Sequence, residues 1–201
     1  RLSIFLGYDG NDFATRTDYL VGFYPIYVAL VDLNNDTHDD LIVAYYDKQN
    51  IGVLLGYGDG SFANLASYYT GLSPSAVGIG DFNNDTFVDV IVANANSNDV
   101  ALLLGIGNGT FNEQTTYPTD SGPSSIAVGD FHGDNSLDIA VTNLGKANMI
   151  IMLQLKTVSL MTSIPFASAV GSDLRWLVID DIDKDSHPDL IVANYGTKSV
   201  G

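Results

Sequence analysis

The chain has 201 residues, of which 46% are hydrophobic, so it is long and apolar enough to bury the core of a globular domain. Its 24 acidic residues outnumber its 8 basic residues, and the net charge of −16 argues against binding to nucleic acid or anionic membranes. No Cys is present, which excludes disulfides, thiolate catalysis and Cys-based metal sites, and no apolar run approaches the ~20 residues that cross a bilayer. Because the chain begins at Arg1 without Met or a signal-like segment, we expect it to be part of a longer protein.

In chain order, short apolar runs separated by turn residues predict β-strands, and no segment has the 3.6-residue periodicity of an amphipathic helix. Each repeat is expected to hold two strands around an acidic loop, a third strand, a glycine-rich turn and a fourth strand. The predicted strands are 26–31, 41–44, 51–55 and a segment ending near Tyr68; 75–80, 90–93, 100–104 and a segment ending near Tyr117; 124–129, 139–142 and 149–153; and 190–193.

Three markers recur with one period of about 49 residues. The acidic loops start at Asp32, Asp81, Asp130 and Asp181, and Leu-Gly-x-Gly-x-Gly-x-Phe turns and prolines keep the same spacing. Four strands per ~50 residues are typical of a propeller blade. We therefore predict an all-β fold, a β-propeller built from about four blades of four strands each.

The expected organisation is one propeller region over residues 1–201. It comprises the end strands of one blade (1–22), three blades (23–71, 72–120 and 121–171) and the first strands of a further blade (172–201). Either these units belong to a larger propeller, or the two end halves pair and close a four-bladed ring. Gln154 and the residues after it replace the glycine-rich turn of the other repeats, so we expect a longer, looser turn there.

The acidic loops follow the pattern Asp, x, Asn/Asp, x, Asp, x, x, x, Asp, and an apolar residue always stands at position 2. Ca²⁺ takes six to eight oxygen ligands, and a tight loop of this pattern offers side-chain oxygens at positions 1, 3, 5 and 9 and a carbonyl at 7. Asp and Asn also favour turns through local hydrogen bonds, but four such loops in register favour calcium over this simpler explanation. Mg²⁺ is the weaker candidate because it demands stricter octahedral geometry.

The loops, the strands that flank them and the glycine-rich turns together resemble FG-GAP/VCBS repeats, the calcium-binding propeller repeats of integrin α chains and many secreted proteins. The resemblance covers the whole chain. It implies up to four Ca²⁺ ions, a secreted protein or the ectodomain of a membrane protein, and a role in cell adhesion or ligand binding. Carried over by position, the metal ligands are Asp32, Asn34, Asp36, His38 and Asp40; Asp81, Asn83, Asp85, Phe87 and Asp89; Asp130, Asp134, Ser136 and Asp138; and Asp181, Asp183, Asp185, His187 and Asp189, with His38, Phe87, Ser136 and His187 contributing carbonyls.

Two departures from the family pattern weaken individual sites. Glycine is usual at loop position 6, where this chain has Thr37, Thr86, Asn135 and Ser186, and a positive φ there would strain threonine. His132 stands at position 3 of the third loop, and because imidazole is a poor Ca²⁺ ligand we expect this site to be the weakest.

The remaining motifs give no enzyme signature: no nucleophile elbow, P-loop or zinc-binding His spacing occurs, and Glu113 is the single glutamate. We therefore expect a non-catalytic protein that binds a protein or glycan ligand. A secreted carbohydrate-active enzyme and a structural repeat spacer are the alternatives. The loops opposite the acidic ones form the candidate ligand face, with Tyr45, Tyr46, Tyr195, Phe23 and Tyr24, whereas Trp176 is expected in the core. Sequons at Asn35, Asn84 and Asn108 are candidate glycosylation sites.

Overall fold

The structure is a computed structural model that describes residues 1–8, 12–154, 160–167, 173–196 and 199–200. It is built from β-strands, and among the described residues no helix is long and apolar enough to cross a membrane. The expected all-β class is confirmed.

Three four-stranded antiparallel sheets form the centre of the molecule, and in each the strands are ordered as they follow in the chain. The first sheet contains β5 (Pro25–Val31), β6 (Asp40–Tyr45), β7 (Asn50–Leu54) and β8 (Ala66–Tyr69); the second β9 (Pro74–Gly80), β10 (Asp89–Asn94), β11 (Asp99–Leu103) and β12 (Thr115–Pro118); the third β13 (Pro123–Gly129), β14 (Asp138–Asn143), β15 (Asn148–Gln154) and β16 (Leu160–Ala167). This strand order is that of propeller blades.

Smaller sheets lie at both ends of the array. At the N-terminal end, β1 (Leu2–Ile4) pairs with β4 (Thr17–Tyr19), and β2 (Gly7–Tyr8) pairs with β3 (Asp12–Phe13). At the C-terminal end, β17 (Leu174–Asp180), β18 (Asp189–Asn194) and β19 (Ser199–Val200) form a three-stranded sheet.

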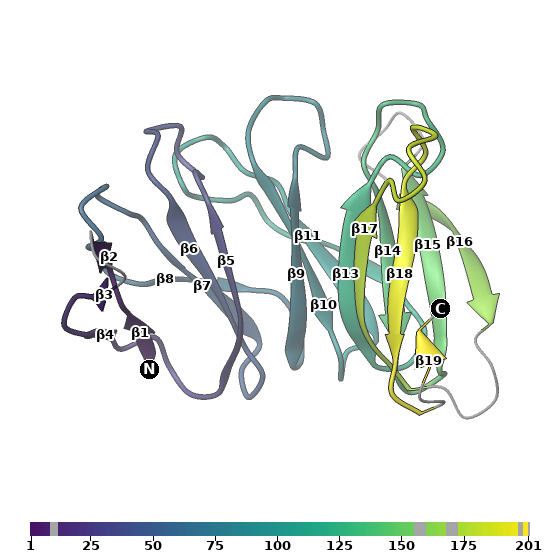
Figure 1. Cartoon of the computed structure of the whole chain (residues 1–201), viewed down its shortest axis with the longest axis horizontal. Coiled ribbons are helices and arrows are strands. Elements are labelled where there is room, and N and C mark those ends of the chain that lie inside the picture. The colour runs from purple at the N-terminus through teal and green to yellow at the C-terminus, as the bar shows by residue number, and fades with distance from the viewer. Residues whose placement is uncertain (9–11, 155–159, 168–172, 197–198, 201) are drawn as a thin grey trace.

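Figure 1 shows β1 at one side of the molecule, β9 in the middle, and β17 and β18 at the other side, where they overlap the third sheet in this view. No strand pairing in the described part of the chain joins the N-terminal strands β1–β4 to the C-terminal sheet β17–β19, so the two end halves do not close a four-bladed ring here. The looser turn expected after Gln154 falls on residues 155–159, outside the described residues.

The core lies between neighbouring sheets. The second strand of each complete sheet is buried at every residue, because it has a sheet on each side. In the first interface, Ile42 and Val53 pack with Val77 and Val90 of the next sheet. Burial of such aliphatic side chains is the main stabilising term of the array.

Candidate metal sites

The four acidic loops connect the first and second strands of their sheets, and the carboxylate at position 1 organises each loop. Asp32 accepts hydrogen bonds from the backbone amides of Asp36 at 3.2 Å and Thr37 at 2.8 Å. Asp81 does the same in the second loop at 3.1 and 2.8 Å. Asp130 and Asp181 repeat the pattern. The loops therefore share one fold.

Positions 3 and 5 face each other at the exposed end of the loop. In the first loop, the Asn34 side chain accepts a hydrogen bond from the Asp36 amide at 3.1 Å and donates one to the Asp36 carboxylate at 2.9 Å. Asn83 and Asp85 form the same pair. The hydrogen bond from the His38 amide lowers the pKa of Asp36, which favours the ionised carboxylate, the form that binds a cation.

The carboxylate at position 9 has a structural role that the sequence did not predict. Asp89 is fully buried, and its two oxygens accept the backbone amides of Phe82 and Gly105, each at 2.8 Å. Asp40 makes the equivalent bonds to Leu33 and Gly56. Position 9 therefore ties the acidic loop to the glycine-rich turn, besides its predicted place among the metal ligands.

Burial of these position-9 carboxylates changes their titration. Desolvation raises the pKa of Asp89 to about 6 and raises that of Asp40 as well, although the amide hydrogen bonds oppose the shift. The nearby carboxylates at positions 1 and 5 raise the pKa further. A divalent cation would relieve this repulsion.

Carboxylates converge most clearly in the fourth loop, where ligand atoms of Asp181, Asp183 and Asp189 all lie within 4.8 Å of one another. In the third loop the same holds for Asp130, His132 and Asp138. Oxygen donors at this spacing fit a hard cation such as Ca²⁺. Positions 1, 3 and 9 therefore meet in the third and fourth loops.

His132 alters the third loop. Its Nδ1 lies 2.8 Å from an Asp138 oxygen and its Nε2 lies 3.1 Å from Asp134. The Asp138 hydrogen bond raises the pKa of His132, so the imidazole favours its charged form between the two carboxylates. The ring thereby occupies oxygens that a cation would need.

The backbone of the loops is left-handed at position 6, as the usual glycine there suggests. Thr37 has φ 71° and Thr86 has φ 73°, and Asn135 and Ser186 are also positive. Threonine in this region is strained because its branched Cβ crowds the backbone. The residues expected to give carbonyl ligands follow directly: the amides of His38, Phe87, Ser136 and His187 each donate to the carboxylate at position 5. Their carbonyl ligation stays a prediction.

Two expectations about aromatic residues are wrong. Tyr45 is 1% exposed and packs with Val21 and Leu54, so it does not belong to a ligand face. Trp176 is half exposed and stacks on Tyr27, with ring centroids 6.1 Å apart. Tyr27 and Trp176 occupy the same position of their repeats, and the two repeats between them have Ala76 and Ser125 there. This alignment of the repeats was the signal in the sequence that could have indicated the contact.

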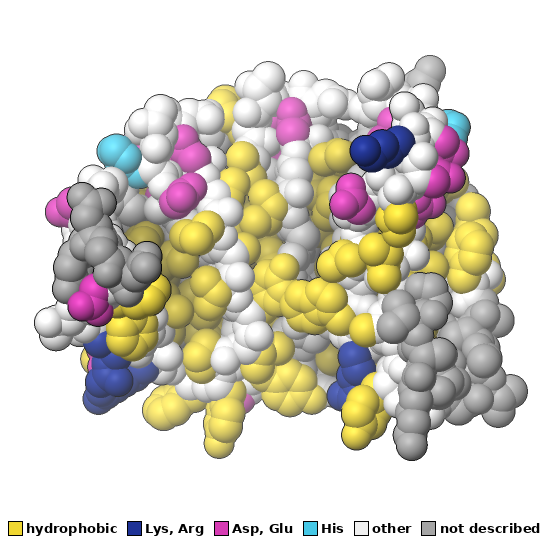
Figure 2. Space-filling model, viewed as in Figure 1, with side chains coloured by type: hydrophobic (Ala, Val, Ile, Leu, Met, Phe, Trp, Pro, Cys, Tyr) yellow, Lys and Arg dark blue, Asp and Glu magenta, His cyan; other side chains and the backbone are white. Residues whose placement is uncertain are grey.

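The other aromatic residues named for that face are exposed, namely Phe23, Tyr24, Tyr46 and Tyr195. Figure 2 shows that most acidic side chains gather at the side of the molecule where the acidic loops lie, whereas hydrophobic side chains dominate the opposite side and basic side chains occur on both. The side of the molecule that carries the acidic loops thus differs in chemistry from the side opposite to it.

Antiparallel four-stranded sheets, repeated about every 49 residues and each carrying an acidic loop between its first two strands, define a class of repeat-built, blade-forming proteins. The family model described as FG-GAP-like repeat matches residues 32–92 and again residues 81–141. The chain belongs to this family. No curated protein sequence matches the chain.

Solved structures share the fold. An Agrocybe aegerita lectin, described as recognising non-reducing terminal N-acetylglucosamine, is 17% identical with a TM-score of 0.65 over 99% of this chain and 58% of that chain. BBS1N in complex with ARL6DN is 15% identical with a TM-score of 0.53, covering 87% of this chain and 49% of that one. A Photorhabdus luminescens Tc holotoxin pore is 17% identical with a TM-score of 0.52, covering 82% and 8%. This chain therefore spans 58% of the length of the lectin chain it matches.

Proposed function

We propose that this chain is a calcium-stabilised, extracellular propeller region that binds a glycan or protein ligand and catalyses no reaction. The observation that carries the calcium part is the convergence of Asp181, Asp183 and Asp189 within 4.8 Å in a loop whose pattern occurs four times. Calcium-binding modules with dissociation constants of about 10⁻⁴–10⁻³ M work in extracellular fluid.

The proposed ion stabilises the turn between the first two strands of each blade. It would neutralise carboxylates that repel one another, and its free energy of binding would add to the free energy of unfolding. Asp40 and Asp89 also hold the glycine-rich turn, so order in the acidic loop extends to the third strand. In the third loop, His132 competes with the ion.

We assign ligand binding to the side of the molecule that lies opposite the acidic loops. Tyr46 and Tyr195 are exposed there, and aromatic rings of this kind stack on sugar rings or pack against protein surfaces. The lectin with a similar fold supports a glycan as the first ligand class to test. A non-catalytic role is supported by the concentration of carboxylates in the repeated loops, and Glu113 is the single glutamate of the chain.

The calcium proposal is tested by titrating the chelator-treated chain with Ca²⁺ in a calorimeter and by thermal unfolding. We expect uptake at millimolar Ca²⁺ or below and a higher melting temperature, and Asp183→Ala should remove one site. The exposed Asp47→Asn variant, at the opposite end, is the matched control for loss of charge. A chain that takes up no Ca²⁺ would refute the proposal.

Ligand binding is tested separately on a glycan array, with wild type and a Tyr46→Ala/Tyr195→Ala variant. We expect wild type to retain a defined glycan class that the variant does not. Binding that is unchanged in the double variant would remove this face from consideration, while leaving the calcium proposal standing.

A further inference from the structure

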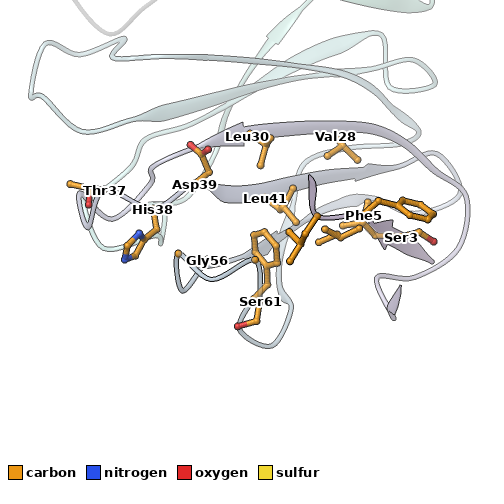
Figure 3. Close-up of a pocket in the computed structure, with 16 residues that line it drawn as sticks. Ser3, Phe5, Val28, Leu30, Thr37, His38, Asp39, Leu41, Gly56 and Ser61 are labelled. Atoms are coloured by element: carbon orange, nitrogen blue, oxygen red, sulfur yellow. The ribbon is translucent and has the colours of Figure 1, made fainter. Parts of the chain in front are cut away.

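The acidic loop and the glycine-rich turn of one repeat lie against each other. Figure 3 shows His38 of the first acidic loop near Gly56 of the first glycine-rich turn, whose amide donates to Asp40 at 2.7 Å. A Cβ on Gly56 would lie 2.2 Å from the Asp39 carbonyl oxygen, so this close approach requires glycine. Loop and turn are therefore in direct contact through the backbone.

The glycine-rich turn of the second repeat also contacts the acidic loop of the first repeat. The Gly109 amide donates to the Leu33 carbonyl at 3.2 Å. Leu33 stands between the ligand positions Asp32 and Asn34. A turn that Asp89 holds to the second loop thus also holds the first loop, so hydrogen bonds connect the two acidic loops.

The third repeat lacks the glycine-rich turn, and Gln154 replaces its first contact. Gln154 occupies the repeat position of Gly105, because the two residues are 49 positions apart. Its backbone amide donates to Asp138 at 2.8 Å, as the Gly105 amide donates to Asp89. The bond from position 9 of the acidic loop to the third strand is therefore kept without glycine.

The side chain of Gln154 replaces the second contact. Its Nε2 donates to the backbone carbonyl of Phe82, which stands at position 2 of the second loop as Leu33 does in the first. Gln154 is 4% exposed and Phe82 is 0% exposed, so loss of this bond would leave a buried carbonyl without its partner. A single buried residue joins the second acidic loop to the third.

We propose that Gln154 is a positioning residue that couples the second and third acidic loops, so that order in one loop, and a cation held there, stabilises the other. Gln154 acts through the Asp138 carboxylate at one loop and through the Phe82 carbonyl, between the ligand positions Asp81 and Asn83, at the other. The cation part of this inference rests on the proposed function, whereas the coupling of the loops does not.

The coupling is a free energy shared by the two loops, so it acts in both directions. A buried hydrogen bond contributes a net stability that changes an equilibrium constant about fivefold. We therefore expect loss of the bond, or loss of order in the third loop, to raise amide exchange in the second loop by about this factor.

The test compares amide hydrogen exchange of four chains in chelator: wild type, Gln154→Met, Asp130→Ala and the double variant. Methionine is unbranched and flexible like glutamine but has no donor, and its backbone amide can still reach Asp138. Asp130→Ala loosens the third loop, because the amides of residues 133–135 lose the carboxylate that accepts their hydrogen bonds.

Exchange is read at Thr86 in the second loop, whose amide donates to Asp81 at 2.8 Å. Ser186, which makes the equivalent bond in the fourth loop at 2.9 Å, is the internal reference. Gln154→Met should raise exchange at Thr86 about fivefold and leave Ser186 unchanged. Asp130→Ala should raise exchange at Thr86 in the wild-type background and add nothing in the Gln154→Met background.

The same exchange is then followed through a Ca²⁺ titration. Asp130→Ala should raise the Ca²⁺ concentration that protects Thr86 about fivefold in the wild-type background and leave it unchanged in the Gln154→Met background. A chain that takes up no Ca²⁺ overturns the proposed function and the cation part of this inference, whereas exchange in chelator still decides whether the loops are coupled.

Gln49→Met is the matched control, because Gln49 is exposed between β6 and β7, on the side opposite the acidic loops. It should exchange like wild type, and thermal unfolding verifies the fold of every variant. The proposal is overturned when Thr86 responds to Asp130→Ala equally in both backgrounds, or in neither. Should Gln154→Met fail to fold, Asp130→Ala alone decides: raised exchange at Thr86 with Ser186 unchanged supports the coupling, and unchanged exchange at Thr86 overturns it.

Discussion

Replacing Phe82 by Ala should be one of the most destabilising single changes in this chain. Phe82 stands at position 2 of the second acidic loop, is 0% exposed and packs with Ile91, Leu102 and Ile126 between the second and third sheets. Truncation of a buried phenylalanine costs about 3–5 kcal/mol, because transfer free energy is lost and a cavity remains. For a chain of this length, that loss lowers the melting temperature by roughly 6–20 °C.

The same repeat position offers a matched control. Ile182 occupies position 2 of the fourth loop but is 60% exposed, so Ile182→Ala should cost less than about 1 kcal/mol. Both variants are compared with wild type by urea unfolding in Ca²⁺. Phe82→Ala should also weaken Ca²⁺ uptake by the second loop, because Phe82 lies between the ligand positions Asp81 and Asn83.

Equal losses at Phe82 and Ile182 would refute this reasoning. Equal losses would mean that the residue at position 2 stabilises the fold through contacts within its own loop, which both residues make. They would contradict a contribution from the neighbouring sheet, because only Phe82 is covered by one. A loss below about 1 kcal/mol at Phe82 would likewise contradict the cavity argument.

Three further predictions concern the acidic loops. Thr86→Gly should raise the free energy of unfolding, measured in urea, by about 0.5–1 kcal/mol, because it relieves the backbone strain at φ 73°. The greater backbone entropy of glycine in the unfolded chain offsets only part of that gain. A loss of stability would contradict the argument that the backbone of Thr86 is strained. His132→Asn should raise the Ca²⁺ affinity of the third loop in calorimetry, because Asp134 and Asp138 lose their imidazole partner and an amide oxygen is gained; unchanged affinity would show that His132 does not compete. In chelator, the raised pKa of Asp89, about 6, contributes stability that is fully present below the unfolded-state pKa and is lost as pH rises from about 4 through 6. The free energy of unfolding of wild type, measured relative to that of Asp89→Asn, should therefore fall over that range, and a rise would show the opposite sign.

The repeat pattern predicted most of the fold because its signals are local. Gly60 and Gly109 have φ 85° and 79°, which glycine adopts without strain, so the hairpin turns follow from the sequence alone. This feature depends on residues within one repeat.

Features that depend on a neighbouring sheet were missed. Tyr45 was placed on an exposed face, but β1 and β4 lie against its sheet, and it packs with Val21 and Leu54. Trp176 was placed in the core, yet it is half exposed beside Tyr27, which is 149 residues earlier in the chain. The sequence shows which residues are equivalent between repeats, but not which of them has a sheet in front of it.

The double role of the position-9 carboxylate connects the metal site to the stability of the blades. Asp89 binds the amides of Phe82 and Gly105, so the acidic loop and the glycine-rich turn share one buried group. A Cβ on Gly105 would lie 2.1 Å from the Val88 carbonyl oxygen, so the amide can approach the loop this closely only from a glycine. Since burial opposes ionisation of Asp89 and a cation would favour it, Ca²⁺ binding and the order of both turns are coupled through this carboxylate. Removal of Ca²⁺ should therefore loosen the glycine-rich turn as well as the acidic loop, which amide hydrogen exchange at Gly105 and Thr86 would measure together. Exchange that increases at Thr86 alone would show that the two turns are independent.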